Sequence, residues 1–144
     1  MLIETHDRAE TFALGKRLGE AAVPGQIIAL TGDLGAGKTT FTQGFAAGLG
    51  ITEPVTSPTF TIMQIYEEGR LPLYHFDVYR IEEPEEMDEI GYEEAFFGDG
   101  VSLVEWADVI PELMPPETIR IDIRRVPSID DSFRRITITP ELTI

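Results

Sequence analysis

The fold is decided by Gly32-Asp33-Leu34-Gly35-Ala36-Gly37-Lys38-Thr39, a glycine-rich stretch that follows a short apolar run. This is the Walker A pattern, in which glycines let backbone N–H groups turn inward and approach phosphate oxygens without a Cβ in the way. Lys38 can reach the β- and γ-phosphates, the Thr39 hydroxyl can bind Mg²⁺, and the positive end of the following helix points at the same anion. The stretch predicts an ATP and Mg²⁺ site, and the alternative is a chance glycine loop between a strand and a helix.

The segments around this loop have the order that a P-loop requires. Residues 26–31 are apolar and rich in β-branched side chains, which is typical of a parallel strand covered on both faces. In residues 38–49 a phenylalanine or leucine recurs every fourth position, and Gly50 is placed to end that helix. An earlier helix is predicted over residues 8–22, because Asp7 and a glutamate three residues later have the spacing of a capping box.

The rest of the sequence predicts a sheet of mixed direction. Further strands are expected at residues 2–3, 59–66, 71–77, 101–104, 119–123 and 133–138. The second and third of these are joined by four residues that suit a β-hairpin. Pro84 can open a short helix that Gly91 ends, and a second can continue through residue 97. No repeat or linker interrupts the chain, so we expect an α/β, P-loop NTPase-like single domain over residues 1–144, with a central mixed sheet flanked by helices.

Composition excludes several classes of function. The formal net charge is −15, from 26 acidic and 11 basic residues, which would repel phosphate backbones, so autonomous nucleic-acid binding is not expected. The chain has no cysteine, no apolar run long enough to span a membrane and no signal-like first ten residues, which predicts a soluble, cytoplasmic protein. Arginines gather in residues 120–135 and acids in residues 82–94, and each run is either a solvated face or a partner surface.

Asp77 and Glu105 are the two candidates for the acidic residue that completes a P-loop metal site. Glu105 ends the apolar run of residues 101–104, which makes it the better metal residue by position. Asp77 ends a run interrupted by Pro72 and His75, which is typical of an edge strand. Each could instead be a capping or turn carboxylate.

Other polar and aromatic residues allow two interpretations. Residues 56–59 follow the P-loop helix, where a segment that senses the γ-phosphate or a plain turn would both fit. His75 and Trp106 are each more typical of packing than of a ligand, and the other histidine, His6, is not at metal-ligand spacing, so no zinc site is expected. The sequence has no asparagine for a guanine-binding motif, which favours ATP, and the helix around Thr11 is a candidate for the adenine pocket.

Four motifs together resemble the TsaE (YjeE) family, in order and spacing, over nearly the whole chain. They are Gly32-Asp33-Leu34-Gly35-Ala36-Gly37-Lys38-Thr39-Thr40, Ser57-Pro58-Thr59-Phe60, His75-Phe76-Asp77-Val78-Tyr79-Arg80 and Val104-Glu105-Trp106. The resemblance implies a bacterial ATPase, weak in isolation, that works with TsaB and TsaD, the pair that makes threonylcarbamoyladenosine on tRNA. The protein would not carry out that transfer itself, but would reset the complex between rounds.

The resemblance also implies roles for individual residues. Lys38 matches the phosphate-binding lysine, Thr39 and Glu105 match the metal ligands, and Asp77 matches the essential acid, which would position water or hold the second shell of the metal. Ser57 and Thr59 match a switch-like segment. The catalytic set is therefore Asp77, Glu105 and Lys38, and the nucleotide contacts are Gly32, Asp33, Leu34, Gly35, Ala36, Gly37, Lys38, Thr39, Thr40, Trp106, Asp108 and Thr11. Asp108 departs from the longer glutamate that many relatives carry.

Two other functions would use the same loop. A small-molecule kinase would need a lid with arginines, yet between residues 57 and 100 the basic residues are Arg70 and Arg80. A non-catalytic, ATP-gated binding module would not need both Asp77 and Glu105. The ATPase hypothesis gives a role to both Asp77 and Glu105.

Overall fold

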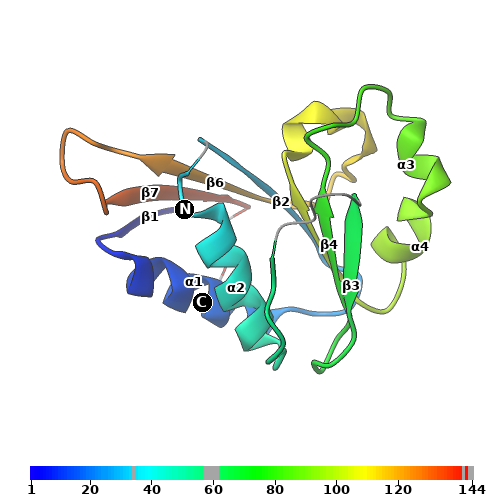
Figure 1. Cartoon of the computed structure of the whole chain (residues 1–144), viewed down its shortest axis with the longest axis horizontal. Helices are drawn as coiled ribbons and strands as arrows, with labels where there is room; N and C mark the ends of the chain where they lie inside the picture. The colour runs from blue at the N-terminus through cyan, green and yellow to red at the C-terminus, as the bar shows by residue number, and fades with distance from the viewer. Residues whose placement is uncertain (34, 57–61, 141, 143–144) are drawn as a thin grey trace.

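One mixed sheet with helices on both faces forms the fold. The structure, a computed structural model, describes residues 1–33, 35–56, 62–140 and 142. In that part of the chain seven strands follow the order β1-β7-β6-β2-β5-β4-β3 (Figure 1). The strands are β1 Leu2–Thr5, β2 Ile27–Gly32, β3 Met63–Tyr66, β4 Leu73–Asp77, β5 Val101–Glu105, β6 Ile119–Arg125 and β7 Arg134–Thr139. The helices are α1 Arg8–Ala21, α2 Lys38–Gly48, α3 Glu86–Glu89 and α4 Tyr92–Phe96, with 3₁₀ turns η1 Ala107–Val109 and η2 Pro111–Leu113. The predicted α/β fold with a mixed sheet is confirmed.

Four neighbouring strands, β6, β2, β5 and β4, run parallel, and the outer strands are antiparallel to their neighbours. The predicted hairpin is β3–β4, in which Met63 pairs with Phe76 and Tyr66 with Leu73. Since parallel strands share one carboxyl edge, the ends of β2, β4 and β5 lie together, where open α/β sheets bind their ligands.

The prediction that Asp77 ends an edge strand is wrong. β4 pairs with β3 on one side and with β5 on the other. Pro72 lies outside the strand, which begins at Leu73, so its missing N–H removes no ladder hydrogen bond. His75 keeps its place in the strand because its side chain is buried against Glu105.

Two apolar cores lie on opposite faces of the sheet. One core joins the sheet to α1 and α2 and includes Leu30, Phe41 and Phe45. The other joins it to α3, α4 and η1 and includes Phe76 and Phe96. Figure 1 shows α1 and α2 together on one side, and α3 and α4 at the far end of the molecule. The apolar run of β2 is buried because both cores use it.

Helices α1 and α2 pack backbone against backbone. A Cβ added at Gly15, Gly19, Gly44 or Gly48 would collide with a carbonyl oxygen of the facing helix.

Hydrogen bonds fix both ends of α1. Asp7 accepts a hydrogen bond from the Glu10 N–H at 2.9 Å, as predicted, although the Glu10 carboxylate accepts from the N–H of His6 and not from that of Asp7. At the other end, Arg70 donates to the carbonyls of Gly19, Glu20 and Ala22 at 2.8, 2.9 and 2.8 Å. None of the helices in the described ranges has the length and apolar character needed to cross a bilayer.

Candidate functional site

The glycine-rich loop runs from the end of β2 to the start of α2. Gly32, Gly35 and Gly37 have φ values of 144°, 75° and 101°, a region that side chains rarely adopt. A Cβ at Gly32 would collide with the backbone of Ile123 in β6, whereas one at Gly35 would meet nothing within 4 Å. The loop therefore encloses open space at the amino-terminal end of α2, where a phosphate group would fit.

Lys38 is the first residue of α2, directly after this loop, and only 7% of its surface is exposed. Its ammonium group donates a hydrogen bond to the Gly32 carbonyl at 3.0 Å and lies 4.0 Å from the centre of the Trp106 ring. Trp106 has a φ of 62° and packs against Tyr79, with ring centres 4.8 Å apart. A non-glycine residue in this region is uncommon and marks a constrained position. The sequence favoured a packing role for Trp106. In the structure Trp106 also contacts Lys38, the proposed phosphate-binding lysine, directly.

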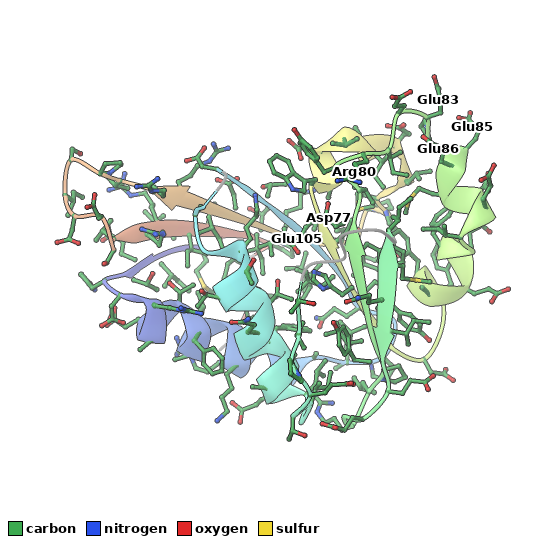
Figure 2. The ribbon with its side chains drawn as sticks, viewed as in Figure 1. Asp77, Arg80, Glu83, Glu85, Glu86 and Glu105 are labelled. Carbon is green, nitrogen blue, oxygen red and sulfur yellow. The ribbon has the colours of Figure 1, made fainter. Side chains whose placement is uncertain are left out.

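Asp77 and Glu105 are neighbours at the carboxyl edge of the sheet, because they are register partners in β4 and β5. Figure 2 shows the two side chains close together, with Arg80 further out. Asp77 accepts a hydrogen bond from the Tyr79 N–H at 3.1 Å. Burial raises the pKa of the Asp77 carboxyl above its ordinary value, against that hydrogen bond, which lowers it, and the nearby Glu105 adds to the rise.

Glu105 is almost completely buried, with 3% of its surface exposed. Its Oε2 atom lies 2.6 Å from Nε2 of His75, which is itself 1% exposed. His75 is therefore not a packing residue alone.

A cavity of about 330 Å³ joins the loop to the two carboxylates. It is lined by Gly35, Gly37, Lys38, Thr39, Asp77, Glu105 and Trp106. The lining combines the loop glycines and Lys38, which could bind phosphate, with hydroxyl and carboxylate oxygens that could bind Mg²⁺. Magnesium prefers oxygen ligands and is commonly held by one or two carboxylates together with substrate phosphates, so the residues present fit the ion.

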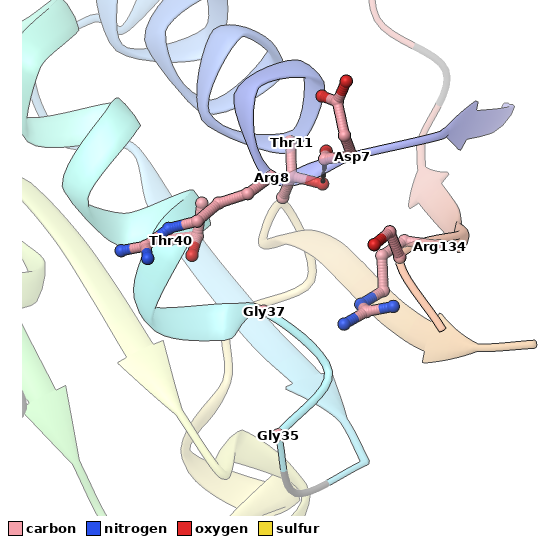
Figure 3. A pocket seen from close by; sticks show the side chains of 8 residues that line it. Asp7, Arg8, Thr11, Gly35, Gly37, Thr40 and Arg134 are labelled. Carbon is pink, nitrogen blue, oxygen red and sulfur yellow. Dashed lines mark hydrogen bonds between the residues drawn. The ribbon is translucent and has the colours of Figure 1, made fainter. Parts of the chain in front are cut away.

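A second cavity of about 200 Å³ lies on the other side of the loop (Figure 3). It is lined by Asp7, Arg8, Thr11, Gly35, Gly37, Thr40, Ser132 and Arg134. Arg134 donates from Nε to the carbonyl of Ala36 at 2.7 Å, so β7 supports the loop from outside. Because the two cavities share Gly35 and Gly37, a nucleotide with its phosphates in the first can extend into the second.

The remaining predicted residues lie in different places. Thr11 and Thr40 lie in the second cavity. Asp108 is exposed on η1 and lines neither cavity. Asp33 pairs with Arg124 of β6 at 3.0 Å, which holds the loop rather than facing a cavity. Leu34, Ser57 and Thr59 lie outside the described residues.

Comparisons with known proteins identify the family. The sequence profile of the family described as threonylcarbamoyl adenosine biosynthesis protein TsaE matches residues 5–134. The chain belongs to the TsaE family. It is 54% identical over 130 residues to the tRNA threonylcarbamoyladenosine biosynthesis protein TsaE of Bacillus subtilis, covering 90% of this chain and 79% of that protein. The corresponding protein of Treponema pallidum is 41% identical over 129 residues, covering 90% and 93%. The crystal structure of Bacillus subtilis YdiB superposes with a TM-score of 0.81 at 47% identity, over 96% of this chain and 83% of that one.

Sequence reasoning missed several residues that line the second cavity of this TsaE family member. Arg8, Ser132 and Arg134 belong to no motif, and Arg8 lies far in sequence from the other two. The gathering of arginines in residues 120–135 was the available signal, but it did not distinguish Arg124 and Arg134, which bind Asp33 and Ala36 of the loop, from the other arginines of that run.

Proposed function

We propose that this chain is a Mg²⁺-dependent ATPase that acts with TsaB and TsaD in the biosynthesis of threonylcarbamoyladenosine on tRNA. The observation that carries the proposal is the cavity between the loop and the sheet edge, because Lys38, Thr39, Asp77 and Glu105 all line it. The names of the relatives support the pathway, since they are tRNA threonylcarbamoyladenosine biosynthesis proteins.

In this proposal each residue has a distinct task. Lys38 and the backbone of the loop bind the phosphates, and Thr39 and Glu105 would hold Mg²⁺, which neutralises charge on the phosphate oxygens when bound. Asp77 positions the water that attacks the γ-phosphate, and its raised pKa suits a group that accepts a proton. The second cavity, with Thr11 and Arg134, receives the base end of the nucleotide.

A small-molecule kinase would need lid arginines that can reach the phosphates. Arg70 is engaged with three carbonyls at the end of α1, far along the sequence from the loop. We therefore propose that water, rather than a metabolite, accepts the γ-phosphoryl group.

The test is ATP hydrolysis by the purified protein with Mg²⁺, alone and with TsaB and TsaD. We expect weak hydrolysis alone, stimulation by the pair, and loss of both in Lys38→Ala. Glu105→Gln should lose hydrolysis, whereas the matched control Glu117→Gln, an exposed residue outside the site, should not. Hydrolysis that is indifferent to the pair would refute the coupled role, and hydrolysis that survives Lys38→Ala would refute the site.

A further inference from the structure

His75 is a buried polar residue that packing does not explain. It lies in β4 with 1% of its surface exposed, and its strand neighbour in β5 is Leu103. Its Nδ1 atom has no hydrogen-bond partner among the described residues. An unpaired buried polar atom costs about 1 to 3 kcal/mol, so an apolar side chain of similar size would suit the core better. The reason for a histidine here must lie in its other nitrogen.

That other nitrogen, Nε2, contacts Oε2 of Glu105 at 2.6 Å, across 30 residues of sequence. A carboxylate only accepts hydrogen bonds, so the imidazole donates from Nε2 to Glu105. The contact is buried on both sides, with side-chain exposures of 1% and 4%, so water does not compete for it. It fixes one oxygen of Glu105 and leaves the other for the cavity that Glu105 lines.

We propose that His75 is a positioning residue, which holds the Glu105 carboxylate in the orientation that binds Mg²⁺. The inference rests on the proposed Mg²⁺ and ATP site. A glutamate side chain has three rotatable bonds, and losing that rotational freedom when the metal binds lowers the affinity for Mg²⁺. Groups that orient a metal ligand by hydrogen bonding contribute about 10- to 100-fold to metal affinity.

Three substitutions separate this role from a structural one. His75→Asn is too short to reach Glu105, His75→Leu fills the space without a donor, and in His75→Gln the amide nitrogen takes nearly the place of Nε2. We expect the Asn and Leu variants to need about 10-fold more Mg²⁺ for half-maximal enhancement of ADP binding. Their ADP affinity in EDTA should match that of the parent protein, and the Gln variant should need nearly the parent's Mg²⁺ concentration.

A double-mutant cycle with Glu105→Gln supplies the coupling test. Because His75 acts through Glu105, His75→Asn should add no further loss in the Glu105→Gln background. A folded His75→Asn variant with the parent's Mg²⁺ dependence would overturn the inference, as would equal losses with and without Mg²⁺. If the parent protein's ADP binding is indifferent to Mg²⁺, the proposed metal site itself fails, which is a different result.

A measurement on the unmodified protein avoids the question of folding. The chain has two histidines, and His6 is exposed beside Glu10, so it serves as an internal control. In the ¹⁵N spectrum of the imidazoles we expect His75 to carry its proton on Nε2. Adding Mg²⁺ to the ADP complex should shift the His75 resonances and leave those of His6 unchanged. An Nε2 atom that carries no proton, or His75 resonances that ignore Mg²⁺, would overturn the inference.

Discussion

Asp77 lies half-buried at the end of β4, where burial raises the pKa of its carboxyl. A raised pKa means that the folded protein binds the proton more tightly than the unfolded chain does. The stability contributed by the protonated form is fully present below the ordinary value of 3.8 and is lost as the pH rises through the folded value. At neutral pH the charged carboxylate therefore costs stability.

Substituting Asp77→Asn should relieve this cost. We expect thermal melts in EDTA at pH 7 to give a higher Tm than the parent protein, with a difference that shrinks as the pH falls toward 4. Hydrolysis should fall by at least about 100-fold, since the proton acceptor is lost. Glu89→Gln, an exposed change on α3, provides the control. A Tm below that of the parent would mean that Asp77 stabilises the fold.

Trp106 is the single tryptophan of the chain, so its fluorescence reports on the site without labelling. Its ring lies under the Lys38 ammonium, which bound phosphates should attract away. We expect ADP to change the emission of Trp106, and Lys38→Met to shift the emission of the free protein and abolish the response to ADP. Emission that ADP leaves unchanged in the parent protein would show that the contact with Lys38 persists.

At the scale of elements, the contact between α1 and α2 depends on four glycines. Gly15→Ala places a methyl group against the carbonyl of Phe41, and Gly44→Ala against that of Phe12. Backbone atoms cannot move aside as a side chain can. We expect each change to lower the free energy of unfolding by about 1 to 3 kcal/mol in urea titrations, although alanine favours helices. Arg17→Ala on the exposed face of α1 should stay within about 0.5 kcal/mol. Equal effects of the glycine and arginine changes would contradict the packing argument.

Elements whose signal is local could be predicted, and contacts across the chain could not. The loop, α2 and the β3–β4 hairpin follow from glycine positions, helical periodicity and turn length within short windows. The interior position of β4 depends on which strands pair with it, and no residue inside the strand encodes that. Arg134 reaches Ala36 across 98 residues, so its role became visible only once β7 and the loop were placed together.

The same limit applies to the candidate site. Lys38, Thr39, Asp77 and Glu105 were predicted and lie in one cavity, because the P-loop pattern and strand ends mark them. The link from Glu105 to His75 joins two strands, and its pairing follows from sheet register rather than from spacing.

At the scale of the whole molecule, the net charge of −15 produces repulsion among the acidic side chains that lowers the stability of the folded protein. Salt at about 0.5 M shortens the screening length to a few ångströms, so we expect the Tm to rise with NaCl between low and high ionic strength. Glu83→Lys and Glu94→Lys, both exposed, should each make that rise smaller, while Gln64→Glu should make it larger. A Tm that falls with NaCl would mean that local ion pairs such as Arg124 with Asp33 dominate over the net charge.

The glycine contacts between α1 and α2 also govern how the site can move. Carbonyl oxygens of one helix fill the space that side chains would occupy on the other, so the two helices behave as one rigid body. Thr11 of α1 and Thr39 of α2 therefore keep a constant separation, which in the proposed function sets the span between the base end and the metal end of the bound nucleotide. Closure around a ligand is then expected from the sheet side of the cavity, where Asp77 ends β4 and Trp106 follows β5.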